Sequence, residues 1–206
     1  MLKTPWFDNK SFLLENHEKI KGKVVDVGCG QMKYQEILEQ STKMKEYVGV
    51  DFYESVGVKI VADLNKELPI ESNQFDTAIC VSVIEHLLEP QTALNETYRI
   101  LKPGGYLLLS TPWIFPFHAR PNDYFRYSRK ALNYMLEKAG FKIVENFPTG
   151  GKFRIVSIFI AFWTPFAGRR THRVLDFIVS KLENRKAIQK MNDTDSPSHH
   201  VIAQKL

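Results

Sequence analysis

The chain has 206 residues, a length that suits one globular domain with a sizeable core. Hydrophobic residues make up 44% and charged residues 25%, and there are two cysteines, which excludes a wholly disordered chain and a disulfide scaffold. The formal net charge of +5 suits an anionic partner, but it does not distinguish a nucleotide from nucleic acid, acidic lipid or polysaccharide phosphate.

The composition of three segments bears on where the protein acts. Residues 1–10 contain no apolar core and no cleavage site, so they do not resemble a secretory signal. Cys29 and Cys80 lie in apolar, strand-like segments, which favours reduced cysteines. Residues 155–167 are the longest apolar stretch, but a membrane span needs about 20 residues. We therefore expect a cytoplasmic protein, with the role of the apolar stretch left open.

Strand and helix signals alternate along the chain. Short β-branched or apolar runs predict strands at residues 24–27, 47–51, 58–63, 75–81, 106–111 and 141–145. Helices are predicted after Gly30, from Glu89-Pro90 to Leu101, and from Ser128 to Ala139. Strands and helices at this spacing indicate right-handed βαβ units.

The predicted fold class is α/β, with a Rossmann-like, doubly wound and mostly parallel sheet. Residues 201–203 supply a seventh strand that can return beside the sixth. We interpret residues 1–206 as a single domain. Residues 20–147 form its ligand-binding core, residues 149–198 a helical insertion, and residues 199–206 the last strand.

The turn after the first strand has the residue types of a nucleotide site. Sheets of this kind bind ligands at the carboxyl ends of their strands. Here the first strand ends in a tight glycine turn that opens a helix, made by Asp26, Gly28, Cys29 and Gly30. A Gly-x-Gly turn by itself is a weak signal.

Two further carboxylates strengthen the nucleotide interpretation. Asp51 ends the second strand, 21 residues after Gly30, where it can accept hydrogen bonds from ribose hydroxyls. Asp63 ends the third strand, where it can meet an adenine amino group. Lys33 occupies the place of the third glycine of the dinucleotide fingerprint, which argues against NAD. The alternative is that these acids only cap helices.

Taken together, the motifs resemble those of class I S-adenosylmethionine-dependent methyltransferases, nearest to the ubiquinone/menaquinone-pathway branch. The resemblance covers about residues 20–147 and is carried by residues 24–30, 47–51, 62–64, 82–87 and 101–105. It implies S-adenosyl-L-methionine as cofactor and S-adenosyl-L-homocysteine as product. The cofactor-binding residues that it implies are Asp26, Gly28, Cys29, Gly30, Asp51, Phe52, Asp63, Leu64 and Val81. Gln31-Met32 departs from the family, in which many members have a further glycine.

Methyl transfer is an in-line displacement that needs an aligned acceptor and a group that takes up its proton. Glu85-His86 follows the fourth strand and supplies two candidate catalytic residues. The alternative is that this pair orients the loop and holds cofactor or water. No His/Cys cluster has the sequence spacing of a metal site, so no metal is expected.

The segment 112–128 is a long loop rich in aromatic residues, prolines and charges, which indicates a functional loop or lid. Its spacing Pro-x-His-x-x-Pro-x-Asp-Tyr-x-Arg-Tyr is similar to that of bacterial methyltransferases associated with lipopolysaccharide or exopolysaccharide biosynthesis. The resemblance implies His118 as general base. It implies acceptor-binding roles for Asp123, Tyr124, Arg126 and Tyr127. The alternative is a loop that packs over the sheet edge, with Arg126–Asp123 as a plain salt bridge.

The insertion differs in composition from the rest of the chain. Residues 153–166 are apolar nearly all round, residues 169–173 form a basic cluster, and residues 174–186 have an amphipathic pattern. Such a segment can lie on an anionic membrane surface, which would suit a lipid-linked acceptor. The alternatives are a helical cap over the active site and a homodimer contact.

The sequence therefore predicts a methyltransferase that acts on an oxygen of a saccharide or a lipid-linked saccharide. Peripheral membrane contact, a cap over the active site and a homodimer contact stay open for residues 153–186. One alternative is methylation of tRNA or another nucleic acid. Nucleic acid is not the expected partner, because the basic residues cluster in the insertion and do not line a groove. A second alternative is a non-catalytic protein that binds S-adenosylmethionine.

Overall fold

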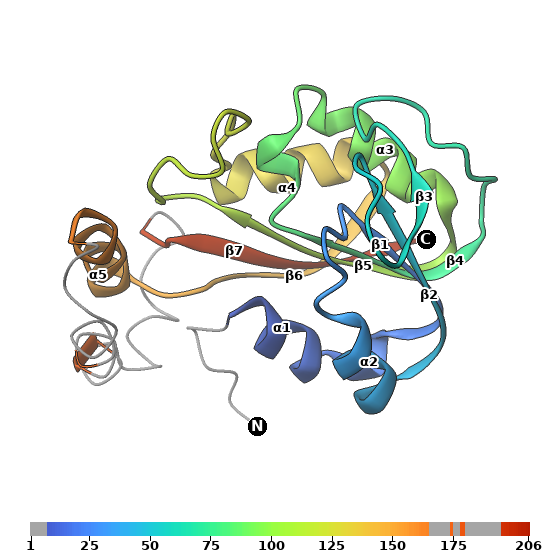
Figure 1. Ribbon diagram of the computed structural model, residues 1–206, viewed down its shortest axis with the longest axis horizontal. Coiled ribbons are helices and arrows are strands. Elements are labelled where there is room, and N and C mark those ends of the chain that lie inside the picture. The colour runs from blue at the N-terminus through green and yellow to red at the C-terminus, as the bar shows by residue number, and fades with distance from the viewer. Residues whose placement is uncertain (1–7, 165–173, 175–177, 180–194) are drawn as a thin grey trace.

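The computed structural model describes residues 8–164, 174, 178–179 and 195–206, which form a twisted sheet with helices on both faces (Figure 1). The strands are β1 (Lys21–Val27), β2 (Lys43–Asp51), β3 (Val58–Val61), β4 (Phe75–Val81), β5 (Leu101–Pro112), β6 (Phe141–Pro148) and β7 (Ser198–Lys205). Their order is β3-β2-β1-β4-β5-β7-β6, and β7 runs antiparallel to both of its neighbours. The predicted seven-stranded, mostly parallel sheet is confirmed.

Of the five described α-helices, four cover the two faces of the sheet in pairs, and the last lies beyond the end of the sheet (Figure 1). The five are α1 (Asn9–Glu15), α2 (Gln35–Ser41), α3 (Pro90–Ile100), α4 (Arg129–Lys138) and α5 (Lys152–Trp163). Leu94 of α3 and Leu132 of α4 pack in one core cluster, while Phe12 of α1 and Leu38 of α2 pack in the other. In Figure 1 the two pairs lie on opposite sides of the sheet.

Local signals fix the ends of the two longer core helices. Pro90 occupies the first turn of α3, where its missing N–H costs nothing. The Ser128 side chain accepts a hydrogen bond from the amide of Ala131 and caps α4. One boundary differs from the prediction: α3 ends at Ile100, and Leu101 together with the Pro103-Gly104-Gly105 turn belongs to β5.

The described part of the insertion contains the helix α5, which is the predicted apolar segment as far as Trp163. The basic cluster 169–173 and most of the amphipathic segment 174–186 lie outside the described residues. Among the helices that the structure describes, none is both long enough and apolar enough to cross a membrane.

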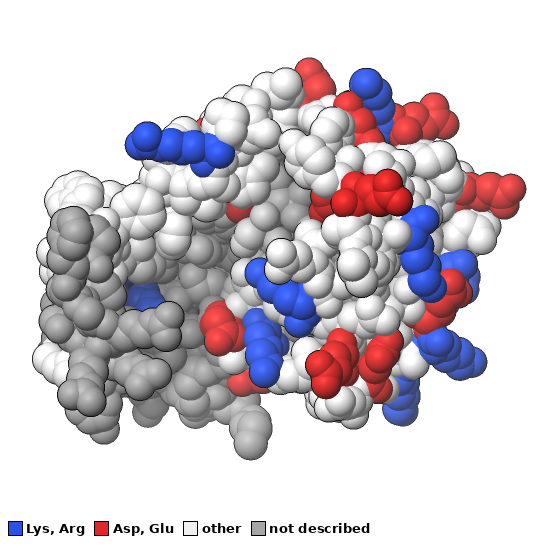
Figure 2. Space-filling model, viewed as in Figure 1, with Lys and Arg blue, Asp and Glu red and all other residues white. Residues whose placement is uncertain are grey.

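The strand order brings the loops of the site to one edge. After β1 the chain moves outward to β2 and β3 and then returns to β4, so the loops that follow β1 and β4 diverge and leave a crevice. The antiparallel β7 adds its start to the same edge, because Ser110 of β5 pairs with His200. On the face shown in Figure 2, the coloured Lys and Arg side chains are interspersed with Asp and Glu.

Candidate active site

A cavity of about 550 Å³ lies over the ends of the strands on one side of the crevice. This volume is within the range of about 300–1,000 Å³ that is usual for small-molecule sites. Five of the predicted cofactor-binding residues line it: Gly28, Asp51, Phe52, Asp63 and Leu64. We call it the donor cavity.

The glycine turn after β1 has a backbone that requires glycine at Gly28. Its φ is +77°, and an added Cβ would lie 2.5 Å from a methyl group of Val83. The amides of Gly28 and Cys29 both donate to the carbonyl of Val50, at 2.8 and 3.1 Å. The turn is thereby fixed against the end of β2.

Four predicted cofactor residues lie beside the donor cavity and are absent from its described lining: Asp26, Cys29, Gly30 and Val81. Asp26 is buried and accepts a hydrogen bond from the hydroxyl of Tyr47. Burial raises the pKa of Asp26 to about 7. The amide of Gly30 donates to Asp51. These contacts position the turn, and a direct contact of the four residues with cofactor stays a prediction.

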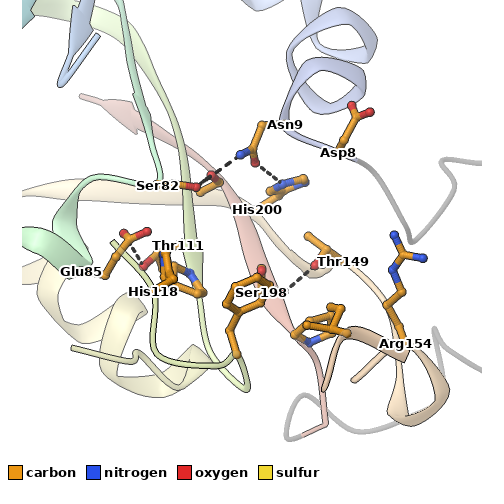
Figure 3. Close-up of a pocket in the computed structure, with 15 residues that line it drawn as sticks. Asp8, Asn9, Ser82, Glu85, Thr111, His118, Thr149, Arg154, Ser198 and His200 are labelled. Carbon is orange, nitrogen blue, oxygen red and sulfur yellow. Dashed lines mark hydrogen bonds between the residues drawn. The ribbon is translucent and has the colours of Figure 1, made fainter. Parts of the chain in front are cut away.

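A second cavity of about 350 Å³ lies next to the ends of β5 and the start of β7 (Figure 3). Its lining is rich in polar side chains, among them Asn9, Glu85, Thr111, His118, Arg154 and His200. The two cavities share Ser82. We call this second space the acceptor cavity.

A chain of hydrogen bonds joins three residues that line the acceptor cavity (Figure 3). His200 Nε2 lies 3.1 Å from Asn9 Oδ1, and Asn9 Nδ2 donates to Ser82 Oγ over 3.3 Å. The sequence did not predict Asn9, Ser82 or His200 as site residues. The antiparallel return of the last strand was the one signal that could have placed His200 beside β5.

Glu85 lies at the boundary of the two cavities and is fully buried. The hydroxyl of Thr111 donates to Glu85 Oε2 at 3.2 Å, whereas Oε1 has no hydrogen-bond partner among the described residues. Burial raises the pKa of Glu85 to about 7. Its Oε1 lies 3.7 Å from His86 Nε2.

The structure brings the two predicted catalytic histidines together. His86 lines the donor cavity and His118 the acceptor cavity, and their ring centroids are 5.2 Å apart. His86 Nδ1 lies 2.6 Å from the carbonyl oxygen of Asn122, and partial burial lowers the pKa of His86. His118 Nδ1 lies 3.2 Å from the carbonyl oxygen of Pro116.

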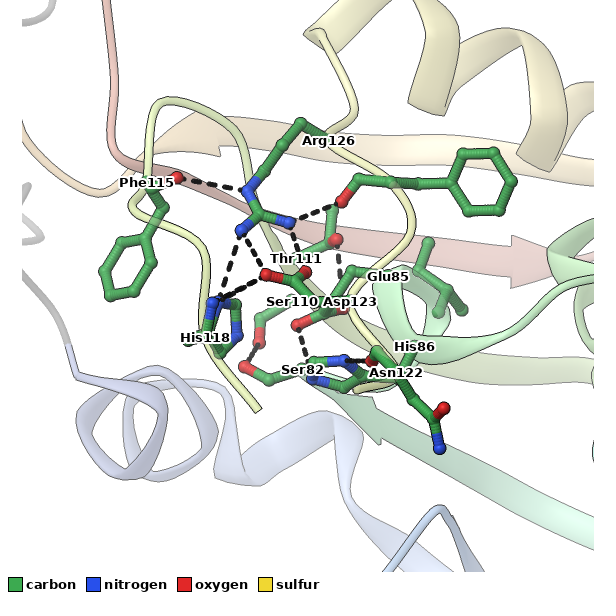
Figure 4. Close-up of polar contacts among 12 residues, drawn as sticks. Ser82, Glu85, His86, Ser110, Thr111, Phe115, His118, Asn122, Asp123 and Arg126 are labelled. Carbon is green, nitrogen blue, oxygen red and sulfur yellow. Dashed lines mark hydrogen bonds and ion pairs between the residues drawn. The ribbon is translucent and has the colours of Figure 1, made fainter. Parts of the chain in front are cut away.

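Arg126 and Asp123 organise the loop between β5 and α4 (Figure 4). Arg126 binds both oxygens of Asp123 and also donates to the carbonyls of Phe115 and Pro116. Asp123 accepts a hydrogen bond from the amide of His118 at 2.7 Å. The Arg126 guanidinium lowers the pKa of Asp123 to about 2. This pair is the salt bridge of the alternative interpretation, and it holds His118 in place through the His118 amide. The acceptor-binding roles of Asp123 and Arg126 stay predictions.

The two predicted acceptor-site tyrosines have different positions. Tyr124 is exposed and lines the donor cavity, which does not correspond to the acceptor wall that was predicted for it. Tyr127 is buried, and its hydroxyl donates to the carbonyl of Ile84 at 3.0 Å. It therefore supports the turn that carries Glu85.

Comparison with known proteins gives consistent matches. The family model described as "Methyltransferase domain" matches residues 25–109. A tRNA U34 carboxymethyltransferase of Helicobacter acinonychis is 30% identical over 198 residues, which cover 79% of this chain and 68% of the relative. A ubiquinone biosynthesis O-methyltransferase of Pseudomonas entomophila is 27% identical over 124 residues, covering 53% of this chain and 50% of the relative.

Solved structures agree on the fold. A putative methyltransferase of Bacillus halodurans superposes with a TM-score of 0.61 at 21% identity, covering 93% of this chain and 96% of that chain. The [4+2]-cyclase SpnF superposes with a TM-score of 0.62 at 19% identity, and the match covers 97% of this chain and 85% of that chain.

The sheet order and the donor cavity define the class I, Rossmann-like methyltransferase fold. The chain belongs to the S-adenosylmethionine-dependent methyltransferases, whose methyl donor is S-adenosyl-L-methionine and whose product is S-adenosyl-L-homocysteine. It spans about half the length of the Pseudomonas entomophila relative.

Proposed function

We propose that this protein transfers the methyl group of S-adenosylmethionine to an oxygen of a small polar acceptor, a saccharide or a lipid-linked saccharide. The observation that carries the proposal is the arrangement of two cavities that share Ser82 and meet at Glu85, His86 and His118. A donor on one side and an acceptor on the other then face each other across these side chains.

The donor cavity has groups that suit S-adenosylmethionine. Asp51 would bind the ribose hydroxyls, Phe52 would pack on adenine, and Asp63 with Leu64 would contact the adenine edge. The cavity is lined by both carboxylates and by apolar side chains, as an adenosine moiety requires. When bound, the cofactor supplies a methyl group that its sulfonium has already activated.

The acceptor cavity suits a ligand with many hydroxyl groups. Ser110, Thr111 and Ser82 offer hydroxyls, and His118 and Arg154 offer nitrogen atoms. We propose that His118 accepts the acceptor's proton through Nε2, because Nδ1 faces the carbonyl oxygen of Pro116. Asp123 is its positioning residue, since it accepts the His118 amide.

A second candidate function is methylation of tRNA. The relative from Helicobacter acinonychis, at 30% identity, carries the name of a tRNA U34 carboxymethyltransferase, which supports tRNA as the acceptor. Binding of nucleic acid requires basic residues along a track. On the face in Figure 2 the described basic side chains are interspersed with acidic ones, which favours the small acceptor. A third candidate is a protein that binds S-adenosylmethionine without catalysis.

The test is a screen with methyl-labelled S-adenosylmethionine against saccharide, lipid and tRNA fractions. We expect label in the saccharide or lipid fraction, and its transfer to tRNA instead would establish the second candidate. His118→Ala should abolish turnover and leave S-adenosylhomocysteine binding intact, as measured by calorimetry. The matched control is His17→Ala, which changes an exposed histidine near α1. If His118→Ala retains activity, the base lies elsewhere, and His86 is the next residue to replace.

A further inference from the structure

We propose that Glu85, His86 and His118 bind a divalent transition-metal cation at the boundary between the two cavities. One potential ligand atom from each of these residues lies within 4.8 Å of the other two. The sequence did not predict a metal site, because His118 follows a different strand from Glu85-His86 and the ligand spacing is not visible along the chain.

The hydrogen bonds of His86 leave one ring nitrogen available as a ligand. Nδ1 lies 2.6 Å from the carbonyl oxygen of Asn122, which can only accept, so Nδ1 carries the proton. Nε2 then has a free lone pair, and it points toward Glu85 Oε1 at 3.7 Å. A backbone carbonyl that fixes the tautomer in this way is typical of histidines that bind metals.

We infer the same tautomer for His118, because most neighbours of its Nδ1 are acceptors. Its Nδ1 lies 3.2 Å from Pro116 O and 3.4 Å from Asp123 Oδ2, which are both acceptors. Arg126 Nη2 can only donate and lies 3.3 Å from the same nitrogen, but it makes shorter hydrogen bonds to Asp123 Oδ2 at 2.7 Å and to Pro116 O at 2.9 Å, so acceptors dominate the surroundings of Nδ1. In this tautomer His118 Nε2 also has a free lone pair. Figure 4 shows the contacts of His118 with Arg126 and Asp123.

Glu85 supplies the third ligand. Its side chain is fully buried, and the structure describes no hydrogen-bond donor for Oε1. A buried carboxylate oxygen without a hydrogen-bond partner is energetically unfavourable. A cation bound to this oxygen would supply the missing interaction. Thr111 donates to the other oxygen at 3.2 Å and holds the carboxylate in orientation.

The local charge also suits a cation. Arg126 and Asp123 form a bidentate ion pair, so their opposite charges cancel. An ionised Glu85 then leaves a net negative charge beside two neutral imidazoles. Metal–ligand bonds of about 2.0–2.2 Å place the ligand atoms about 3–3.5 Å apart, so the side chains would close in by up to about 1–2 Å. Two imidazoles and one carboxylate favour Zn²⁺, Co²⁺ or Fe²⁺ over Mg²⁺ or Ca²⁺.

Three protein ligands leave a coordination position for water or an acceptor oxygen. An acceptor hydroxyl bound there would have a lowered pKa and would release its proton to solvent water. With the cation bound, His118 Nε2 would be a ligand, so the proton-accepting role proposed above applies to the metal-free protein. This catalytic role rests on the proposed function. The binding of the cation does not rest on it and can be measured on its own.

The test uses the full chain, free of any affinity tag and stripped with a chelator, titrated with Co²⁺ or Zn²⁺ alone. We expect one equivalent of Co²⁺ to bind and to produce visible d–d absorption. Glu85→Gln and His118→Ala should each weaken binding at least tenfold in calorimetry, while His17→Ala should match the unaltered protein. Circular dichroism identifies a variant that fails to fold. If one of these two variants is unfolded, the Co²⁺ affinity of the other decides the outcome.

The absence of Co²⁺ binding, or unaltered affinity in both folded variants, overturns the metal site. S-adenosylhomocysteine titrations on the same samples keep the two proposals apart. Protein that binds S-adenosylhomocysteine and no Co²⁺ refutes the metal site and leaves the proposed function in place. Protein that binds Co²⁺ and shows no methyl transfer with the metal restored refutes the proposed function and supports the site.

Discussion

The amide of Gly30 donates a hydrogen bond of 2.8 Å to Asp51 Oδ2, although the two residues are 21 positions apart in the chain. The other carboxylate oxygen accepts a hydrogen bond from the amide of Tyr53 at 3.2 Å. One side chain thereby links the glycine turn after β1 to the loop after β2 and also lines the donor cavity. It shapes the cavity in addition to offering a group for the ribose.

Replacing Asp51 by Ala should therefore weaken the binding of S-adenosylhomocysteine at least tenfold. The change removes both the ribose acceptor and the bond that holds Gly30. Isothermal titration calorimetry measures the effect, and Glu54→Ala is the matched control, because Glu54 is an exposed acid in the same loop. Equal affinity in Asp51→Ala and the unaltered protein would show that this cavity does not hold the cofactor.

The two glycines of the turn should differ in their tolerance of alanine. Gly28 has φ +77° and lacks space beside Val83, whereas Gly30 has φ +54° and nothing within 4 Å of an added Cβ. We expect Gly28→Ala to lower the free energy of unfolding by about 2–3 kcal/mol and Gly30→Ala by about 1 kcal/mol. Urea denaturation measures both values.

The double variant Gly28→Ala/Val83→Ala is the control for the steric part of this prediction. Trimming Val83 removes the atoms that a Cβ at Gly28 would meet at 2.5 Å, so the two changes should be less than additive. Additive losses would show that the backbone conformation alone accounts for the effect.

The sheet could be predicted from the sequence because each strand carries its own local signal. β4 is buried along nearly its whole length, which corresponds to the continuous apolar run that predicted it. The helix α1 was missed although α2, which was predicted, has the same length of seven residues, because α2 follows a recognisable strand and glycine turn and α1 does not. Its cap is one hydrogen bond from the amide of Ser11 to Asp8, and its apolar contribution is the pair Phe12-Leu13.

The sequence could predict site residues that lie within one loop, but it could not predict which loops come together in the fold. Glu85-His86 and His118 were predicted separately, but their convergence depends on the pairing of β4 with β5, which carries the two loops side by side. Asn9 and His200 lie 191 positions apart, so no local pattern could have joined them. The polar character of the acceptor cavity arises from that long-range packing.

The buried His199 should make the fold sensitive to acid. Burial lowers its pKa to about 4, assisted by the positive charge of Arg129. Between about pH 6.5 and pH 4 the unfolded chain holds a proton that the folded chain lacks, so the free energy of unfolding falls as the pH falls. The contribution reaches about 1.4 kcal/mol per pH unit.

Asp26 and Glu85 oppose this effect, because their pKa values of about 7 mean that the folded chain holds protons there which the unfolded chain has released. The test therefore compares the change in the free energy of unfolding between two pH values in the unaltered protein with the same change in a variant. Denaturant unfolding of the unaltered protein and of His199→Leu at pH 7 and pH 5 should give a smaller acid-induced loss for the variant. The same loss in both proteins would refute a role for His199.

The exposed apolar side chains of α5 predict contact with a membrane surface. Phe153, Val156, Ile160, Phe162 and Trp163 are all at least 42% exposed, so the described packing leaves much of this helix uncovered. We expect the protein to float with anionic liposomes, because aromatic and aliphatic side chains insert at the boundary between headgroups and acyl chains. Phe162→Glu/Trp163→Glu should reduce the floating fraction several-fold.

The control for this prediction is Tyr134→Glu, since Tyr134 is 65% exposed on α4. If the unaltered protein does not float but forms a dimer that the double variant disrupts in light scattering, α5 is a contact between subunits.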